Sequence, residues 1–272
     1  MSARGQSTVV DVALALVLVS AAVGLLTAPS PATTDDAADE VAAALQTSTV
    51  TVSADGGNRT LHGTPAQLLA RATVDRARFE GTALRRPDPA TRRAVERAVA
   101  RVARHRAARA QVIARWQPYS GAPAAGRVVV GGTPPASATV DAAATTIPAP
   151  LPSGAVPPTR AAPGYDALGS AAAESVVAVV APQSLLRRAR YDERARTRLV
   201  ERLRRLDRAL GGRTVAPDRP ASANLTATRE RLRGALAARF AADLRERFAS
   251  PDRAARAVTV GEIRIVIRTW SP

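Results

Sequence analysis

The chain has 272 residues, enough for one substantial domain or two small ones, and it carries a formal net charge of +16. It contains no cysteine, which excludes disulfides and thiolate metal ligands, and only two histidines. All 39 basic residues are arginine, and only 3% of the residues are aromatic, so a core has to be built mainly of Ala, Val and Leu.

The first feature in chain order is an apolar segment behind a short basic head. From Val12 to Ala28 the sequence has 17 residues without a charge, close to the roughly 20 residues that a helix needs to cross the hydrocarbon layer. The segment also lacks the polar stripe of a packed soluble helix. It therefore predicts a cytoplasmic leader over residues 1–8 and a transmembrane helix over residues 9–28. A cleaved secretory signal and a buried core helix are the alternatives.

The charges beside this segment predict its orientation. Arg4 precedes it, whereas residues 29–58 contain five acidic residues and no arginine. Positive charge close to a membrane span favours the cytoplasmic side. We therefore expect a single-pass protein of the cell membrane, with the bulk of the chain extracytoplasmic.

Both ends of the chain resemble a known family. The start, Arg4-Gly5-Gln6-Ser7-Thr8-Val9-Val10-Asp11, resembles archaeal prepilin-type N-termini. It is more closely similar to uncharacterised haloarchaeal pilin-like membrane proteins, which are often encoded beside archaeal type IV pilus or secretion components. Residues 258–270 resemble the C-terminal end of that group.

The resemblance implies a cleavage site and a role for one acidic residue. A prepilin-type peptidase would cut between Gly5 and Gln6. The membrane helix would pack laterally against other pilin-like membrane proteins, and Asp11 would meet the positive terminus of a partner inside the membrane. The alternative for Asp11 is an interfacial residue at the start of the helix.

Residues 29–116 predict a hairpin followed by helices. Alternating β-branched residues over 47–52 precede the turn sequence Asp55-Gly56-Gly57-Asn58, which predicts a hairpin near 47–61. Thr64-Pro65 and Asp88-Pro89 each place an N-cap residue before a proline. They predict helices over 65–80 and 89–116.

The next stretch, residues 117–164, contains ten prolines and predicts a Pro/Ala/Gly-rich linker or loop. Only residues 127–130 in it resemble a strand. Residues 171–181 are ambiguous between a helix and a buried strand.

Residues 165–272 predict arginine-rich helices and a C-terminal strand. One apolar helix face ends at Gly211-Gly212, and a second, with an apolar residue at every fourth position from Leu232 to Phe248, ends at Pro251. Residues 258–270 alternate as a half-buried strand does, and we expect this strand to pair with the hairpin. The predicted fold class is α+β: one N-terminal transmembrane helix, then a helix-rich extracytoplasmic domain with a small antiparallel sheet.

The sequence offers no recognisable catalytic, cofactor or metal motif. His62 and His105 are the only histidines and neither has a partner motif, so nucleophilic catalysis lacks an evident base. We therefore expect no catalytic residue, no cofactor and no metal, and a protein that is not an enzyme. Asn58 and Asn224 both match the N-glycosylation acceptor pattern. The alternative for Asn224 is a helix cap.

These features predict a membrane-anchored, pilin-like structural or accessory protein of a surface or secretion apparatus. Its expected partners are other pilin-like membrane proteins, the lipid bilayer and acidic surface polymers. Two basic blocks, residues 59–119 with 14 arginines and residues 183–272 with 22, favour an alternative. It is an Arg-rich polyanion-binding module, for nucleic acid or anionic lipid, with reversed topology. Specific nucleic-acid recognition is disfavoured, because no zinc spacing, aromatic stacking set or glycine-rich phosphate loop accompanies the arginines.

Overall fold

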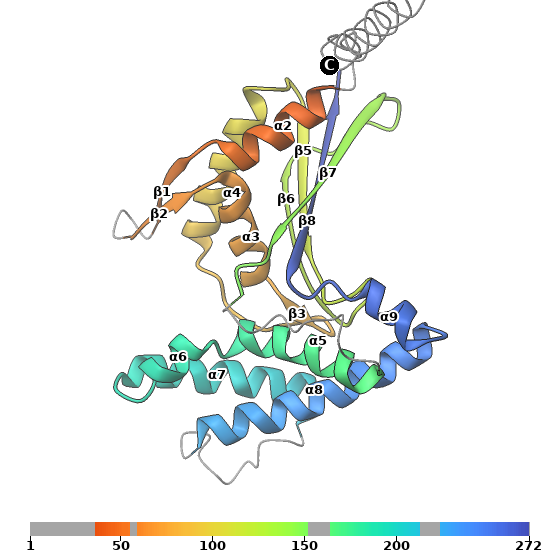
Figure 1. The fold of residues 1–272 in the computed structure, drawn as a ribbon. Coiled ribbons are helices and arrows are strands. Elements are labelled where there is room, and N and C mark those ends of the chain that lie inside the picture. Colours follow the sequence, from red (N-terminus) through yellow and green to blue (C-terminus); the bar gives the residue numbers. More distant parts are fainter. Residues whose placement is uncertain (1–35, 55–58, 152–163, 213–223, 272) are drawn as a thin grey trace, which may run out of the picture. The chain divides into compact units, whose positions relative to one another are not determined.

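The computed structural model describes residues 36–54, 59–151, 164–212 and 224–271. Within these ranges there are eight helices and eight strands, and the strands form a two-stranded and a six-stranded antiparallel sheet (Figure 1). The described residues from Ala37 onward belong to one unit.

The predicted hairpin is present. Helix α2 (Asp36–Thr47) leads into β1 (Val50–Ala54), which pairs antiparallel with β2 (Arg59–Gly63). Helix α3 (Pro65–Asp75) follows, and Thr64 and Gln67 form a capping box at its start. The Gln67 amide donates to Thr64 Oγ1 at 3.2 Å, and the Thr64 amide donates to Gln67 Oε1 at 3.1 Å.

The larger sheet joins distant parts of the chain. Its strand order is β4-β3-β6-β5-β8-β7. The six strands are β3 (Arg78–Phe79), β4 (Thr82–Ala83), β5 (Ala110–Trp116), β6 (Ala124–Gly131), β7 (Val140–Pro148) and β8 (Glu262–Trp270). The last strand of the protein therefore lies inside the sheet, between β5 and β7.

One face of this sheet forms the core with helices α3 and α4 (Pro89–Arg104), which contact β5 and β6 (Figure 1). Ile263, Ile265 and Ile267 are fully buried there, because alternate residues of a strand point to the same face. This alternation confirms the predicted C-terminal strand.

The remaining helices make up the second half of the described fold. They are α5 (Tyr165–Val180), α6 (Gln183–Arg188), α7 (Glu193–Ala209), α8 (Leu225–Arg247) and α9 (Pro251–Ala257). Helix α5 is apolar on almost every side and largely buried, as expected of a helix enclosed by others. Phe240 of α8 connects this half to the sheet, since its ring meets Phe79 and Tyr119 edge-on at centroid distances of 6.0 and 5.9 Å.

The predicted fold class is wrong. The C-terminal strand does not join the hairpin in a small sheet: the hairpin is a separate two-stranded sheet, and β8 lies in a six-stranded one. The predicted helix over 89–116 ends at Arg104, and Ala110–Trp116 is strand β5. The stretch over 117–164, predicted as linker or loop, contains β6 and β7. The described prolines of this stretch lie outside these strands, apart from Pro148 at the last position of β7, so none interrupts the interior of a ladder.

The transmembrane part of that fold class has no counterpart in the described structure. Across residues 36–54, 59–151, 164–212 and 224–271, no helix combines the length and apolar character needed to cross a bilayer. The predicted leader over 1–8 and transmembrane helix over 9–28 lie outside the described residues.

Candidate anion-binding site

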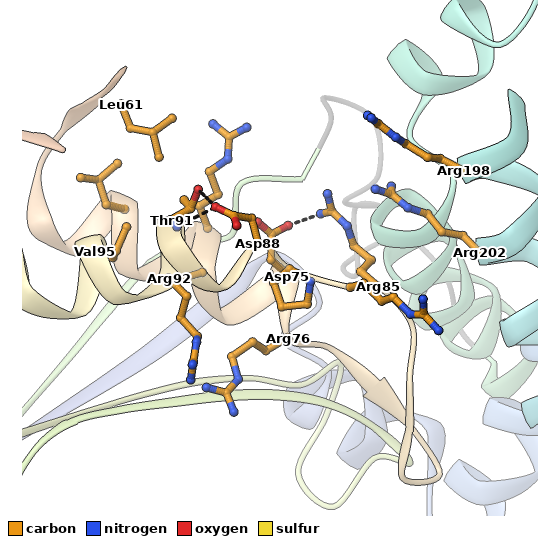
Figure 2. Close-up of a pocket in the computed structure, with 15 residues that line it drawn as sticks. Leu61, Asp75, Arg76, Arg85, Asp88, Thr91, Arg92, Val95, Arg198 and Arg202 are labelled. Atoms are coloured by element: carbon orange, nitrogen blue, oxygen red, sulfur yellow. Dashed lines mark hydrogen bonds and ion pairs between the residues drawn. The ribbon is translucent and has the colours of Figure 1, made fainter. Parts of the chain in front are cut away.

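A cavity of about 370 Å³ lies among α3, α4, α7 and the loop that precedes α4 (Figure 2). Ligand pockets commonly have volumes of about 300–1,000 Å³. Among the described residues, the charged side chains around this cavity are seven arginines and two aspartates: Arg71, Arg76, Arg85, Arg86, Arg92, Arg198, Arg202, Asp75 and Asp88. The wall is thus strongly positive.

Helix α7 supplies the arginines of one side. Arg198 and Arg202 are four residues apart, so they lie on the same face of the helix. Another face of α7 anchors the helix, because Leu199, Leu203 and Leu206 are buried in the core. Figure 2 shows Arg198 and Arg202 extending from α7 towards the side of the cavity where Asp75 and Arg85 lie.

The acidic residues near the cavity already have partners. Asp75 of α3 forms an ion pair with Arg85. Asp88 is the N-cap of α4 and accepts from the amides of Ala90 and Thr91 at 3.2 and 2.7 Å. Glu96 lies 3.7 Å from Arg92. Within the part of the chain that the structure describes, four of the arginines form no ion pair: Arg71, Arg86, Arg198 and Arg202.

Arg202 is the most perturbed of these arginines. It is half-buried, and among the described residues its side chain makes one hydrogen bond, from Nη1 to the carbonyl oxygen of Val180 at 3.5 Å. Burial, and secondly the positive charge of Arg85, lowers the pKa of the Arg202 guanidinium to about 10, and the negative charge of Asp75 offsets only part of this effect. A desolvated cation beside like charges is unfavourable unless an anion compensates it. The arrangement is therefore suited to binding an anion with several negatively charged oxygens.

The structure places only one of the site residues predicted from sequence. Asn224 is the N-cap of α8, and its Oδ1 accepts from the Ala227 amide at 2.9 Å, which corresponds to the helix-cap alternative. Glycosylation at Asn224 stays a prediction. Four other predicted site residues lie outside the described ranges: Gly5, Gln6, Asp11 and Asn58.

The two histidines lie in different elements. His62 Nδ1 is 3.0 Å from Thr51 Oγ1 across the hairpin, and His105 caps the C-terminal end of α4. In the described ranges, no group of three or more His, Cys, Asp or Glu side chains has the geometry to hold a metal ion.

The sequence predicted arginine-rich blocks but not this cavity. Arg85 and Arg86 belong to one block and Arg198 and Arg202 to the other, and only the tertiary fold brings them together. The one local indication was the presence of like charges four residues apart on α7, an arrangement that destabilises an isolated helix.

One family model matches this chain. It describes a family of unknown function, DUF7284, and it covers residues 10–270. The chain belongs to this family. No curated protein and no solved structure matches the DUF7284 chain.

Nothing in the DUF7284 match connects the chain with pilin-like or haloarchaeal proteins. Neither this match nor the described helices, none of which can span a membrane, supports the expected signal-anchored, pilin-like membrane protein.

Proposed function

We propose that this DUF7284 protein is a non-enzymatic binding module for a ligand with clustered phosphate groups, which it holds in the arginine cavity. The observation that carries this proposal is Arg202. Its guanidinium is half-buried and faces other arginines, and in the described ranges no carboxylate forms an ion pair with it. A bound oxyanion would supply the missing negative charge.

The residue type favours phosphate. A guanidinium donates two parallel hydrogen bonds to phosphate oxygens, and these charge-assisted bonds are stronger than bonds between neutral groups. Several such groups around one cavity match a ligand with more than one charge. Leu61, Leu68 and Val95 add an apolar portion to the wall. None of the described residues that line the cavity is aromatic, so stacking on a nucleic-acid base is not supported.

Clustered phosphates occur in free polyphosphate, in nucleic-acid backbones and in anionic lipid headgroups. A binding experiment with three probes distinguishes these sources: inorganic tripolyphosphate, an oligothymidylate, and vesicles that contain phosphatidylglycerol. At about 0.15 M salt, long-range attraction between exposed charges is largely screened, so the remaining affinity reports direct contacts. The probe with the highest remaining affinity identifies the source.

The double variant R198Q/R202Q tests the site. A charge-assisted hydrogen bond contributes about 1.5–3 kcal/mol, so we expect about tenfold or greater loss of affinity for tripolyphosphate. R204Q/R208Q is the matched control, because it removes the same charge from exposed positions of the same helix. It should change the affinity by about twofold at most.

Equal weakening by both variants would contradict the proposal, because binding would then follow the overall charge of +16 rather than the cavity.

A structural or accessory role in a surface or secretion apparatus, with the bulk of the chain outside the cell, stays an untested prediction.

A further inference from the structure

Three arginines face one another across neighbouring strands of the six-stranded sheet. Arg115 of β5 lies opposite Arg127 of β6 on one side and opposite Arg264 of β8 on the other. All three side chains are exposed. They lie on the face that α3 and α4 do not cover, since the buried residues of these strands alternate with them.

This row is energetically unusual. Cβ atoms of directly opposed residues in an antiparallel pair lie about 4.5–5.5 Å apart, and like charges there are destabilising. Across the described ranges, none of the three arginines forms an ion pair or a side-chain hydrogen bond. By contrast, Arg205 of α7 pairs with the acidic Glu201 one helical turn before it. On this face of β8, Glu262 is exposed two residues before Arg264, but among the described residues it forms no ion pair with the row, so the row keeps most of its positive charge.

An apolar row lies beside the arginine row. Ile113 is opposite both Val129 and Val266, and Val129 has 37% of its surface exposed. Beyond this row Gln111 lies opposite Arg268, which is exposed. Residues two apart on a strand are separated by about 6.6 Å, so the three rows together are about 13 Å wide. A helix with its side chains has a diameter of about 10–12 Å.

We propose that this sheet face docks an acidic amphipathic helix of a partner protein. The apolar stripe of that helix covers Ile113, Val129 and Val266. Its Asp or Glu side chains on one flank meet the arginine row, and those on the other flank meet Arg268. A helix with this charge pattern removes the like-charge repulsion and the apolar exposure together.

Single-stranded nucleic acid fits this face less well. Proteins that bind it combine a positively charged groove with aromatic side chains on which the bases stack, and the three rows contain no aromatic residue. The inference is independent of the arginine cavity, because none of the three rows contributes a residue to the cavity wall.

The test uses a synthetic helical peptide of about 18 residues, or five turns, with a leucine stripe flanked by glutamates. A scrambled peptide of the same composition and an oligothymidylate are the comparison probes. The variant R115Q/R127Q/R264Q removes the arginine row. The control R93Q/R97Q/R101Q removes three exposed arginines of α4 that have no ion pair among the described residues.

We expect the full chain to bind the amphipathic peptide, and the sheet variant to bind it about tenfold or more weakly. The control should remain within about twofold. A second variant, V129T/V266T, keeps every charge and should weaken binding about threefold or more, since it makes the apolar row polar. Circular dichroism of each variant verifies that the fold is retained.

Two outcomes would overturn the inference. The first is equal affinity for the ordered and scrambled peptides, or equal weakening by the sheet and helix variants. The second is an oligothymidylate that binds more tightly than the peptide and loses its affinity in the sheet variant, which would make this face a nucleic-acid surface.

Discussion

Individual arginines of this protein divide into those with an acidic partner and those without. Arg205 pairs with Glu201 at 3.1 Å and Arg247 with Asp243 at 2.8 Å, each with the acid four residues earlier. Ion pairs at this spacing on a helix contribute only about 0.3–0.5 kcal/mol each. The informative arginines are therefore the unpaired ones that lie close to other arginines, in the cavity wall and across the neighbouring strands of the sheet.

Tyr119 allows a test of one buried polar contact. Its hydroxyl donates to Asp243 Oδ2 at 2.8 Å, and burial, followed by this hydrogen bond, raises the pKa of the phenol above its ordinary value of 10.0. Replacing Tyr119 with Phe removes the bond. At about pH 8 we expect Y119F to lose about 1 kcal/mol of unfolding free energy.

The pH dependence of that difference has a definite sign. The pKa of the Tyr119 phenol is higher in the folded than in the unfolded state, so the phenol contributes fully to the free energy of unfolding below about pH 10. As the pH rises further, this contribution falls by about 1.4 kcal/mol per pH unit. The advantage of the wild type over Y119F should therefore shrink between about pH 8 and about pH 11. Urea unfolding at both values measures it, and an unchanged difference would contradict the assignment.

In the packed helices α5 and α8, replacing a glycine with alanine should change the stability of the protein in opposite directions at two positions. A Cβ on Gly169 of α5 would lie 2.6 Å from the carbonyl oxygen of Ala237 in α8, whereas Gly234 of α8 has open space around its Cα. Alanine favours a helix over glycine by about 1 kcal/mol. We expect G234A to stabilise the protein by about 0.5–1 kcal/mol. G169A should destabilise it by about 1–3 kcal/mol, because α5 and α8 must separate.

Thermal or urea unfolding of the two glycine variants gives the comparison directly. If G169A were as stable as G234A, the close approach of α5 and α8 would be contradicted. The pair is well matched, since both substitutions make the same chemical change inside a helix.

Elements with a strong local pattern were predictable, and those that depend on distant pairing were not. The leucines of α7 and the alternation of β8 are visible in the sequence, and both elements are present. Strand β5 was not predictable, because no Gly or Pro lies between α4 and Ala110 to end the helical pattern. Strand β7 is rich in Ala and Thr, so its alternation is weak, and it pairs with β8 more than a hundred residues later.

The charge of the whole molecule, +16, opposes the compact state through self-repulsion. In the described ranges this repulsion is concentrated where arginines from distant segments meet. The candidate site was unpredictable for the same reason as the sheet: Arg85 and Arg202 become neighbours only in the folded chain. A multivalent anion should consequently stabilise this protein far more than a monovalent salt does.

That expectation can be measured through the thermal midpoint. A ligand at 100 times its Kd stabilises the folded state by about 2.7 kcal/mol. For a chain of this size, 1 kcal/mol corresponds to about 2–4 °C. Tripolyphosphate at saturating concentration should therefore raise the midpoint by several degrees more than sodium chloride of equal ionic strength. Screening by chloride affects wild type and R198Q/R202Q alike, so the extra rise should largely disappear in this variant. A rise of equal size in both proteins would place the anion elsewhere and contradict the cavity as its site.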